Sequence, residues 1–286
     1  MPDGNMHPPY SIKRNGGTNM ASVTQRIKQI KQPRGGYINP SALIMRQMED
    51  NQTLGPENLH PSVIGTVVDY LTRYMLTQNV HEAFDISILG YQARMYMLGP
   101  QILEKDKKLH IDLPYLLSRI DGLDDHSIIA ACKSCCYDVW YRNPLYLTTR
   151  DQSQAQITMP DQQTISNIRT MVMRSMQFFD EYGPVKSTGF TFEPNGYTIT
   201  VHSGDGDYLT ADTLWDFKVP KSEPTNKHTL QLLMYWIMGQ HSGNKIFENI
   251  EKLGIFNPRL NKVYTININK VPKEIIKVVE TDVIGY

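Results

Sequence analysis

The spacing of apolar residues predicts helices over most of the first 184 residues. The clearest, at 60 to 78, repeats its apolar residues about every 3.6 positions, as an amphipathic helix does. A second long helix is predicted at 161 to 181, where Asp161 caps the start and Gly183-Pro184 ends it. Shorter helical segments are expected at 39 to 50, 91 to 105, 113 to 120 and 124 to 140.

Strand-forming residues become frequent after position 185. Two runs joined by Pro194-Asn195-Gly196 predict a β-hairpin, and "GDGDYLT" and "TLWDFKV" continue it as a meander. A helix is predicted at 226 to 241, followed by a short helix near 245 to 253, strands "GIFN" and "KVYTINI" and a final helix. This order predicts an α+β or mixed α/β fold whose sheet is built from roughly the last hundred residues.

Four aspartates interrupt the strand-forming stretch "GDGDYLTADTLWDFKVPKS" at 204 to 222. If its two strands pair as an antiparallel hairpin, Asp207 lies opposite Asp216. Alternation then places Lys218 on the face of Asp216, with Trp215 and Phe217 on the other face.

Opposed carboxylates destabilise a hairpin unless something offsets their repulsion. A divalent cation does so, because Mg²⁺ and Mn²⁺ take oxygen ligands, and a neighbouring lysine can hold an attacking water. The pattern therefore predicts metal-assisted phosphodiester hydrolysis. The alternative is a solvated hairpin in which Lys218 pairs with one of the two aspartates.

Charge and cysteine content narrow the function classes. Lys+Arg and Asp+Glu each number 29, so no global positive field attracts nucleic acid or an acidic membrane. Residues 1 to 39 form a basic arm, expected to be partly disordered, that serves as an interaction segment or a solvated face. Its basic residues are Lys13, Arg14, Arg26, Lys28, Lys31 and Arg34.

Three cysteines, Cys132, Cys135 and Cys136, lie in a helical pattern without the second pair that a zinc site needs. We interpret them as reduced, packed thiols; a cluster completed by thiols of another chain is the alternative. No apolar run reaches the roughly 18 residues that span a bilayer, and no signal-peptide pattern opens the chain, so a cytoplasmic location without membrane contact is predicted.

Three short motifs occur in order after position 203: "GDGD", then "DFK", then "QLLMY". Together they resemble motifs II, III and IV of the PD-(D/E)XK nuclease superfamily, and the QxxxY form resembles the RecB-like branch. The resemblance implies a restriction-endonuclease-like core at 185 to 286, with a central mixed sheet flanked by helices. A helical segment at 40 to 184 would precede this core and carry motif I.

The resemblance also implies roles for individual residues. The catalytic residues that it implies are Asp207, Asp216, Lys218, Gln231 and Tyr235. The ligands that it implies for Mg²⁺ or Mn²⁺ are Asp69, Asp207, Asp216 and the main-chain carbonyl of Phe217. Substrate contacts are assigned to Gln231, Tyr235, Lys221 and Arg259.

Motif I is the position at which the chain departs from the family pattern. In "IGTVVDYL" Asp69 stands where RecB-like members have histidine, and Gly65 leaves room beside it for a metal or a strand. Asp180 and Glu181 are alternatives for the same role.

Further polar residues have two interpretations each. Asp205 is a supporting residue near the site. Arg259 binds backbone phosphate or forms a structural salt bridge, and Lys221 can bind phosphate just beyond the strand. His202 and His228 contact phosphate or relay protons, or are ordinary polar positions.

These features predict a metal-dependent nuclease, with DNA favoured over RNA as substrate. A catalytically inactive nucleic-acid-binding or assembly protein of the same fold is the alternative, and a purely structural domain is a third. No Walker-type phosphate loop is present, so unwinding would require a protein partner such as a helicase or another mobile-element or defence component.

Overall fold

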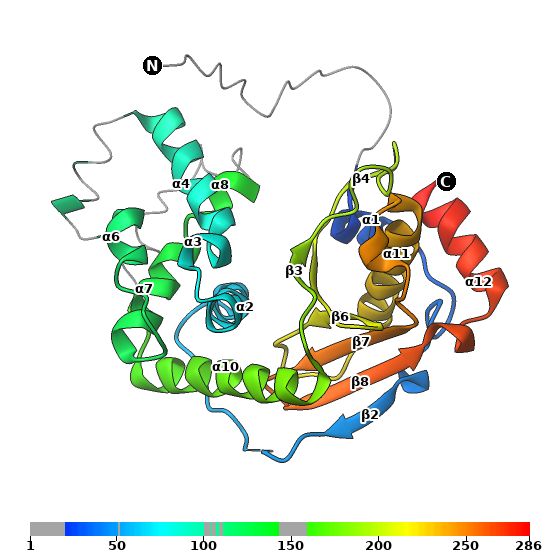
Figure 1. Ribbon diagram of the computed structural model, residues 1–286, viewed down its shortest axis with the longest axis horizontal. Coiled ribbons are helices and arrows are strands. Elements are labelled where there is room, and N and C mark those ends of the chain that lie inside the picture. The colour runs from blue at the N-terminus through cyan, green and yellow to red at the C-terminus, as the bar shows by residue number, and fades with distance from the viewer. Residues whose placement is uncertain (1–20, 51, 100–103, 105–106, 109–110, 143–158) are drawn as a thin grey trace.

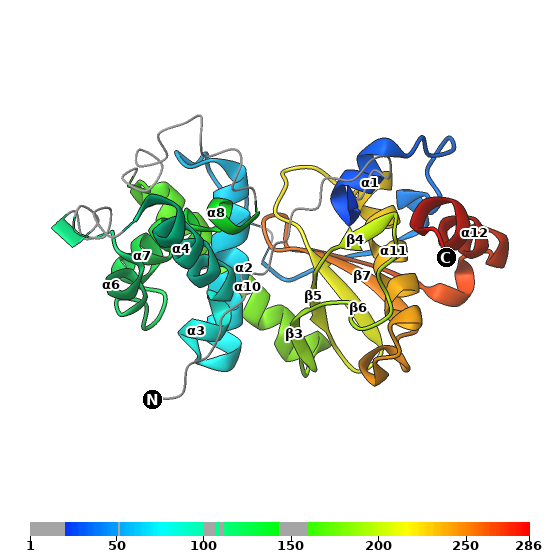
Figure 2. The same ribbon diagram turned by 90° about the horizontal axis from the view of Figure 1, so that it is seen from above.

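The structure is a computed structural model that describes residues 21–50, 52–99, 104, 107–108, 111–142 and 159–286. The start of the basic arm, with Lys13 and Arg14, lies outside these residues, as does the end of the helix expected at 91 to 105. The chain forms a helical lobe and a sheet lobe, joined underneath by one long helix (Figures 1 and 2).

The helical lobe follows the predicted periodicity. Its helices are α2 (Pro61–Thr77), α3 (Val80–Ala83), α4 (Asp85–Leu98), α6 (Leu113–Leu117), α7 (Asp125–Cys135), α8 (Asp138–Arg142) and the first half of α10 (Gln162–Tyr182). Asp124 and Asp161 cap α7 and α10, each accepting a main-chain N–H at 2.7 Å. The apolar stripe of α2 packs in one buried cluster with residues of α7 and α10, so the helices expected at 60 to 78 and 161 to 181 are confirmed.

Within the described residues, six strands form a mixed sheet in the order β2-β8-β7-β6-β5-β3. They are β2 (Ile44–Gln47), β3 (Ser187–Phe190), β5 (Gly206–Leu209), β6 (Thr213–Phe217), β7 (Lys252–Asn257) and β8 (Lys262–Asn267). Neighbours are antiparallel except β6 and β7, which are parallel and joined through α11 (Asn226–Ser242). The predicted α+β class with a mixed sheet is confirmed.

Helices cover the sheet on both faces (Figure 1). On one face α11 packs with α1 (Val23–Gln29) and the C-terminal π-helix η5 (Val279–Ile284), which follows α12 (Lys273–Val278). On the other face the second half of α10 places Phe178 and Phe179 against the rings of β5, β6 and β7. Short 3-10 turns complete the lobe at η1 (Pro40–Ala42), η3 (Lys245–Phe247) and η4 (Ile268–Lys270).

Four predicted elements differ from the structure. The helix expected at 124 to 140 is two helices, α7 and α8, separated by a turn at 136 and 137. The helical segment expected at 39 to 50 is instead turn η1 followed by the edge strand β2. The hairpin expected around Pro194-Asn195-Gly196 does not form, because β3 pairs with β5, while β4 (Val201–Ser203) pairs in parallel with β1 (Ala21–Ser22). The turn itself exists, since the Gly196 N–H donates to the Phe192 carbonyl. The short helix expected near 245 to 253 is reduced to η3, and the last residues of that range already belong to β7, which begins at Lys252.

Part of the basic arm is ordered. Val23, Ile27 and Ile38 are buried in the core beneath α11, because a short amphipathic helix buries its apolar side while its polar side stays exposed. Arg26 donates to the main-chain carbonyls of Asp282 and Val283 and is therefore structural. Both the arm expected at 1 to 39 and the segment expected at 40 to 184 thus contribute to the sheet lobe.

The cysteines lie on and just after α7, and Cys132 and Cys135 are buried. Burial raises the pKa of the Cys132 and Cys135 thiols and raises that of Cys136 to about 12. They remain protonated at neutral pH, as expected of packed thiols. In the part of the chain that the structure describes, no helix is long and apolar enough to cross a membrane.

Candidate active site

The hairpin of β5 and β6 has the predicted register. Tyr208 pairs with Trp215 and Leu209 with Leu214, and the turn closes where the Thr210 N–H donates to the Thr213 carbonyl. Continued by one residue, this register sets Asp207 opposite Asp216. The Asp207 carboxylate accepts a hydrogen bond at 2.7 Å from the main-chain N–H of Phe217, the residue that follows Asp216.

The two aspartates occupy the face of the sheet that α11 covers. Leu209 and Leu214 belong to the cluster on that face, whereas Tyr208 and Trp215 belong to the opposite cluster with α10. Because side chains alternate along a strand, Asp207 and Asp216 point with the leucines, toward α11. The predicted placement of Trp215 and Phe217 on the other face is also confirmed, and Trp215 is buried there.

Lys218 forms an ion pair with Asp216. Its Nζ lies 2.7 Å from both carboxylate oxygens, and it donates a hydrogen bond to Oδ1. Asp216 is buried, and within the described residues its Oδ2 has the Lys218 ammonium as its one polar partner. A carboxylate oxygen has more than one lone pair, so this atom can accept a further ligand beside Lys218.

Charges within the group determine its protonation. Burial, then repulsion from Asp216 and Asp69, raises the pKa of Asp207 to about 8. Burial alone would lower the pKa of Lys218, but the charges of Asp216 and Asp207 outweigh it and raise that pKa. Lys218 therefore stays an ammonium group, which donates hydrogen bonds and cannot accept a proton.

Gln231 and Tyr235 lie four residues apart on α11 and are both buried. The Gln231 side-chain amide donates to the Tyr235 hydroxyl at 2.8 Å. Burial raises the pKa of Tyr235, and the charge of Asp216 raises it further. Because α11 covers the sheet face to which Asp207 and Asp216 point, Gln231 and Tyr235 lie on the same side of the sheet as the two carboxylates.

Asp69 approaches the group from α2 with both oxygens engaged. Oδ1 accepts from Arg73 Nε at 3.1 Å and from the Tyr208 hydroxyl at 2.8 Å, and Oδ2 pairs with Arg73 Nη2 at 2.8 Å. Tyr208 points to the sheet face opposite Asp207, and the charge of Asp69 also acts on Asp207 and Lys218. The segment after β6 passes close to Gly65, since a Cβ there would lie 3.1 Å from the Val219 side chain. A metal beside Gly65 stays a prediction.

Arg73 is a site residue that the sequence analysis missed. The charges of Asp69, Tyr208 and Asp207 raise the pKa of its guanidinium and outweigh burial, which acts in the opposite direction. The i,i+4 spacing from Asp69 was the available signal. No pattern near Asp69 in the sequence indicated that Tyr208 of β5 would also hydrogen-bond to its carboxylate.

The alternatives for motif I lie elsewhere. Glu181 pairs with Arg46 of β2, and Asp180 lines a surface pocket beside Arg174 and Asp50. Asp205 is exposed and lies 3.8 Å from Arg142 of α8. These residues do not join the two central aspartates.

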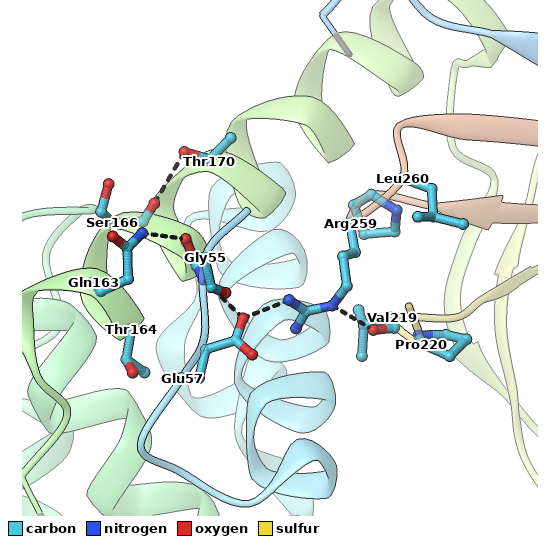
Figure 3. A network of polar contacts seen from close by, with 12 residues as sticks. Gly55, Glu57, Gln163, Thr164, Ser166, Thr170, Val219, Pro220, Arg259 and Leu260 are labelled. Atoms are coloured by element: carbon cyan, nitrogen blue, oxygen red, sulfur yellow. Dashed lines mark hydrogen bonds and ion pairs between the residues drawn. The ribbon is translucent and has the colours of Figure 1, made fainter. Parts of the chain in front are cut away.

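Arg259 has the structural role that the sequence left open. It is buried, donates to the Val219 carbonyl and pairs with Glu57, whose carboxylate also accepts from Asn167 at 2.9 Å (Figure 3). With these partners it braces the segment after Lys218 against the helical lobe, and its guanidinium is occupied by protein groups rather than by phosphate. Lys221 and His202 are exposed.

Within the described residues, no three or more His, Cys, Asp or Glu side chains are grouped so that they could hold a metal. The donors available at the centre are thus two carboxylates, Asp207 and Asp216, with main-chain oxygen nearby. No family model, curated protein or solved structure matches the chain.

Proposed function

We propose that the protein is a metal-dependent nuclease that hydrolyses phosphodiester bonds, with DNA favoured as substrate. The observation that carries the proposal is the opposed pair Asp207 and Asp216 with Lys218 beside them. Two buried carboxylates share one ammonium group, and the repulsion between them raises the pKa of Asp207, so an added cation would stabilise this site. Those donors fit Mg²⁺ or Mn²⁺.

Two carboxylates are sufficient for such an ion. Mg²⁺ in phosphoryl-transfer sites is commonly bound by one or two carboxylates, water and substrate phosphate rather than by a full protein cage. Asp207, Asp216 and the Phe217 carbonyl would hold it, where it would polarise a phosphoryl oxygen and neutralise the carboxylates. Asp69 would join them only after leaving Arg73.

Lys218 acts in this proposal as a charged donor. Because its pKa is raised, it orients the attacking water and stabilises negative charge on the phosphate, without accepting a proton. Gln231 and Tyr235 support the substrate strand from α11. Exposed Lys221 can contact phosphate beside them.

The topology supports the same proposal. An antiparallel meander followed by a helix crossover to a parallel neighbour is compatible with a restriction-endonuclease-like core of the RecB-like type. Unwinding, if the substrate requires it, would come from a partner such as a helicase or another mobile-element or defence component.

The test compares two acid–lysine pairs of one sheet. Asp216→Asn and Lys218→Met should each reduce Mg²⁺- or Mn²⁺-dependent cleavage by about 100-fold or more. Asp216 would hold the cation and Lys218 would donate to the phosphate, so each would stabilise the negative charge that develops on the phosphate during the reaction. Asp212→Asn and Lys252→Met change the pair at the turn, whose charged atoms lie 2.8 Å apart, and should stay within about threefold of the parent. Substrates are linear and circular DNA, single- and double-stranded, and RNA, with chelator as control.

Metal binding is read separately from cleavage. Mg²⁺ or Mn²⁺ should raise the melting temperature of the parent and of Asp212→Asn, and not that of Asp216→Asn. Equal cleavage by Asp216→Asn and Asp212→Asn would refute the proposal.

A non-catalytic nucleic-acid-binding protein is the second candidate. It is favoured by the engagement of Asp69 with Arg73, which leaves the centre without a third free carboxylate. Nucleic-acid binding that persists in chelator, without cleavage under either metal, would establish it.

A further inference from the structure

A half-buried histidine, His228, extends the polar face of α11 that carries Gln231 and Tyr235. The three positions are related as i, i+3 and i+7, so they lie along one side of the helix. The charges of Lys218 and Asp216 both act on His228, and Asp216 also acts on Tyr235. Because α11 packs on the sheet face to which Asp216 points, its polar side lies near the Asp216–Lys218 pair.

Hydrogen bonding determines which nitrogen of His228 carries the proton. The main-chain N–H of Thr225 donates to Nδ1 at 3.2 Å. A main-chain N–H can only donate, so Nδ1 is an acceptor and the proton of the neutral ring is on Nε2. Among the described residues, Nε2 has no hydrogen-bond partner.

Electrostatics keep this ring neutral. Burial lowers the pKa of His228, and the positive charge of Lys218 lowers it further, while Asp216 acts in the opposite direction. The result is one N–H donor near the proposed reaction centre for which the described part of the chain provides no acceptor. Such a donor adds direction to an anion site in which Lys218 already supplies the charge.

We propose that Nε2–H of His228 donates a hydrogen bond to a non-bridging oxygen of the scissile phosphate and holds it beside Lys218. This inference rests on the proposed nuclease function and adds a substrate-contacting residue to it. The competing explanation is that His228 serves α11 alone, by accepting the Thr225 N–H at the helix start.

Two substitutions separate these explanations. Glu and Gln are the usual residues at the third helical position of a capping box, so His228→Glu and His228→Gln both retain an acceptor for the Thr225 N–H. Gln also provides an N–H donor, whereas Glu provides none. Ser222→Glu places one added negative charge on the exposed loop nearby and controls for charge alone.

Cleavage and melting temperature are measured for all three variants with the metal that supports parental cleavage. We expect unchanged melting temperatures, a loss of about tenfold or more in kcat/KM for His228→Glu, and retention within about threefold for His228→Gln and Ser222→Glu. Parental activity in His228→Glu, or equal losses in His228→Glu and Ser222→Glu, would overturn the role of His228 and leave the nuclease proposal intact. Absence of metal-dependent cleavage in the parent would overturn both.

Discussion

Asp69 contributes first to stability, because its carboxylate neutralises a guanidinium that is nearly removed from water. Arg73 lies near the rings of Tyr70 and Tyr208, 5.8 and 5.9 Å from their centroids, and its ion-pair partner on the same helix is Asp69. Removing one member of such a pair leaves the other charge poorly solvated.

Asp69→Asn should therefore lower the free energy of unfolding by about 2 kcal/mol or more. Arg73→Met alone should also destabilise, whereas the double variant should be less destabilised than the two single effects added together. Chemical denaturation of the four proteins measures the coupling. Additive effects would show that the pair does not stabilise the fold.

Activity of Asp69→Asn, measured below its melting temperature, addresses motif I. A carboxylate held by Arg73 and Tyr208 is not a metal ligand in this arrangement, so cleavage should fall less than in Asp216→Asn. Equal losses would show that Asp69 leaves Arg73 during the reaction.

At the scale of elements, α10 contributes to two cores with different parts of its length. Its first half is buried with α2 and α7, and its second half places Phe178 against Phe256, Trp215 and Phe217. Ring stacking and edge contacts add to the apolar area that these residues bury.

Phe178→Ala should lower the free energy of unfolding by about 3 to 5 kcal/mol, since it opens a cavity between helix and sheet. Met173→Ala is the control on the same helix, because that side chain is 59% exposed, and it should change stability by less than about 0.5 kcal/mol. Thermal or chemical denaturation distinguishes them. Similar losses for both variants would contradict the two-core assignment of α10.

Local signals were sufficient for capped helices and for the β5–β6 register, because caps and tight turns depend on residues close in sequence. Strand β2 could not be predicted in this way. Its apolar residues Ile44 and Met45 are 73% and 51% exposed, so the hydrophobic pattern of this segment does not indicate a strand with one buried face. The strand conformation depends instead on pairing with β8.

The candidate site was likewise predictable only where local patterns determine which residues meet. Asp207, Asp216 and Lys218 come together through hairpin register, and Gln231 with Tyr235 through helical spacing. The partners of Asp69 and Arg259 come from other elements, namely Tyr208 of β5 and the loop residue Glu57, so their roles required the tertiary structure.

At the scale of the whole molecule, Arg174 connects the lobes. From α10 it pairs with Asp50 at 2.8 Å and donates to the carbonyls of Gln52, Pro258 and Arg259. The hydrogen bond from Arg174 is the largest of the effects that lower the pKa of Asp50.

A carboxyl group whose pKa is lowered on folding stabilises the folded state above its ordinary pKa, and this contribution disappears as the pH falls. Asp50→Asn should therefore be less stable than the parent at pH 7 by roughly 1 kcal/mol, since Asp50 is partly solvated. The difference should persist down to about pH 5 and shrink below about pH 4. Denaturation at a series of pH values measures it, and a pH-independent difference would exclude the ion pair as its cause.

The shared helix α10 also limits how the chain can be divided. A fragment that begins after Tyr182 would keep the proposed catalytic residues of β5, β6 and α11, but it would lose Phe178 and Phe179 from beneath the sheet and β2 from its edge. A fragment that ends there would retain those phenylalanines without the rings that they cover. The strands that carry the proposed catalytic residues therefore do not constitute a transferable module, and inheritance or engineering of the proposed activity must carry the helical lobe with it.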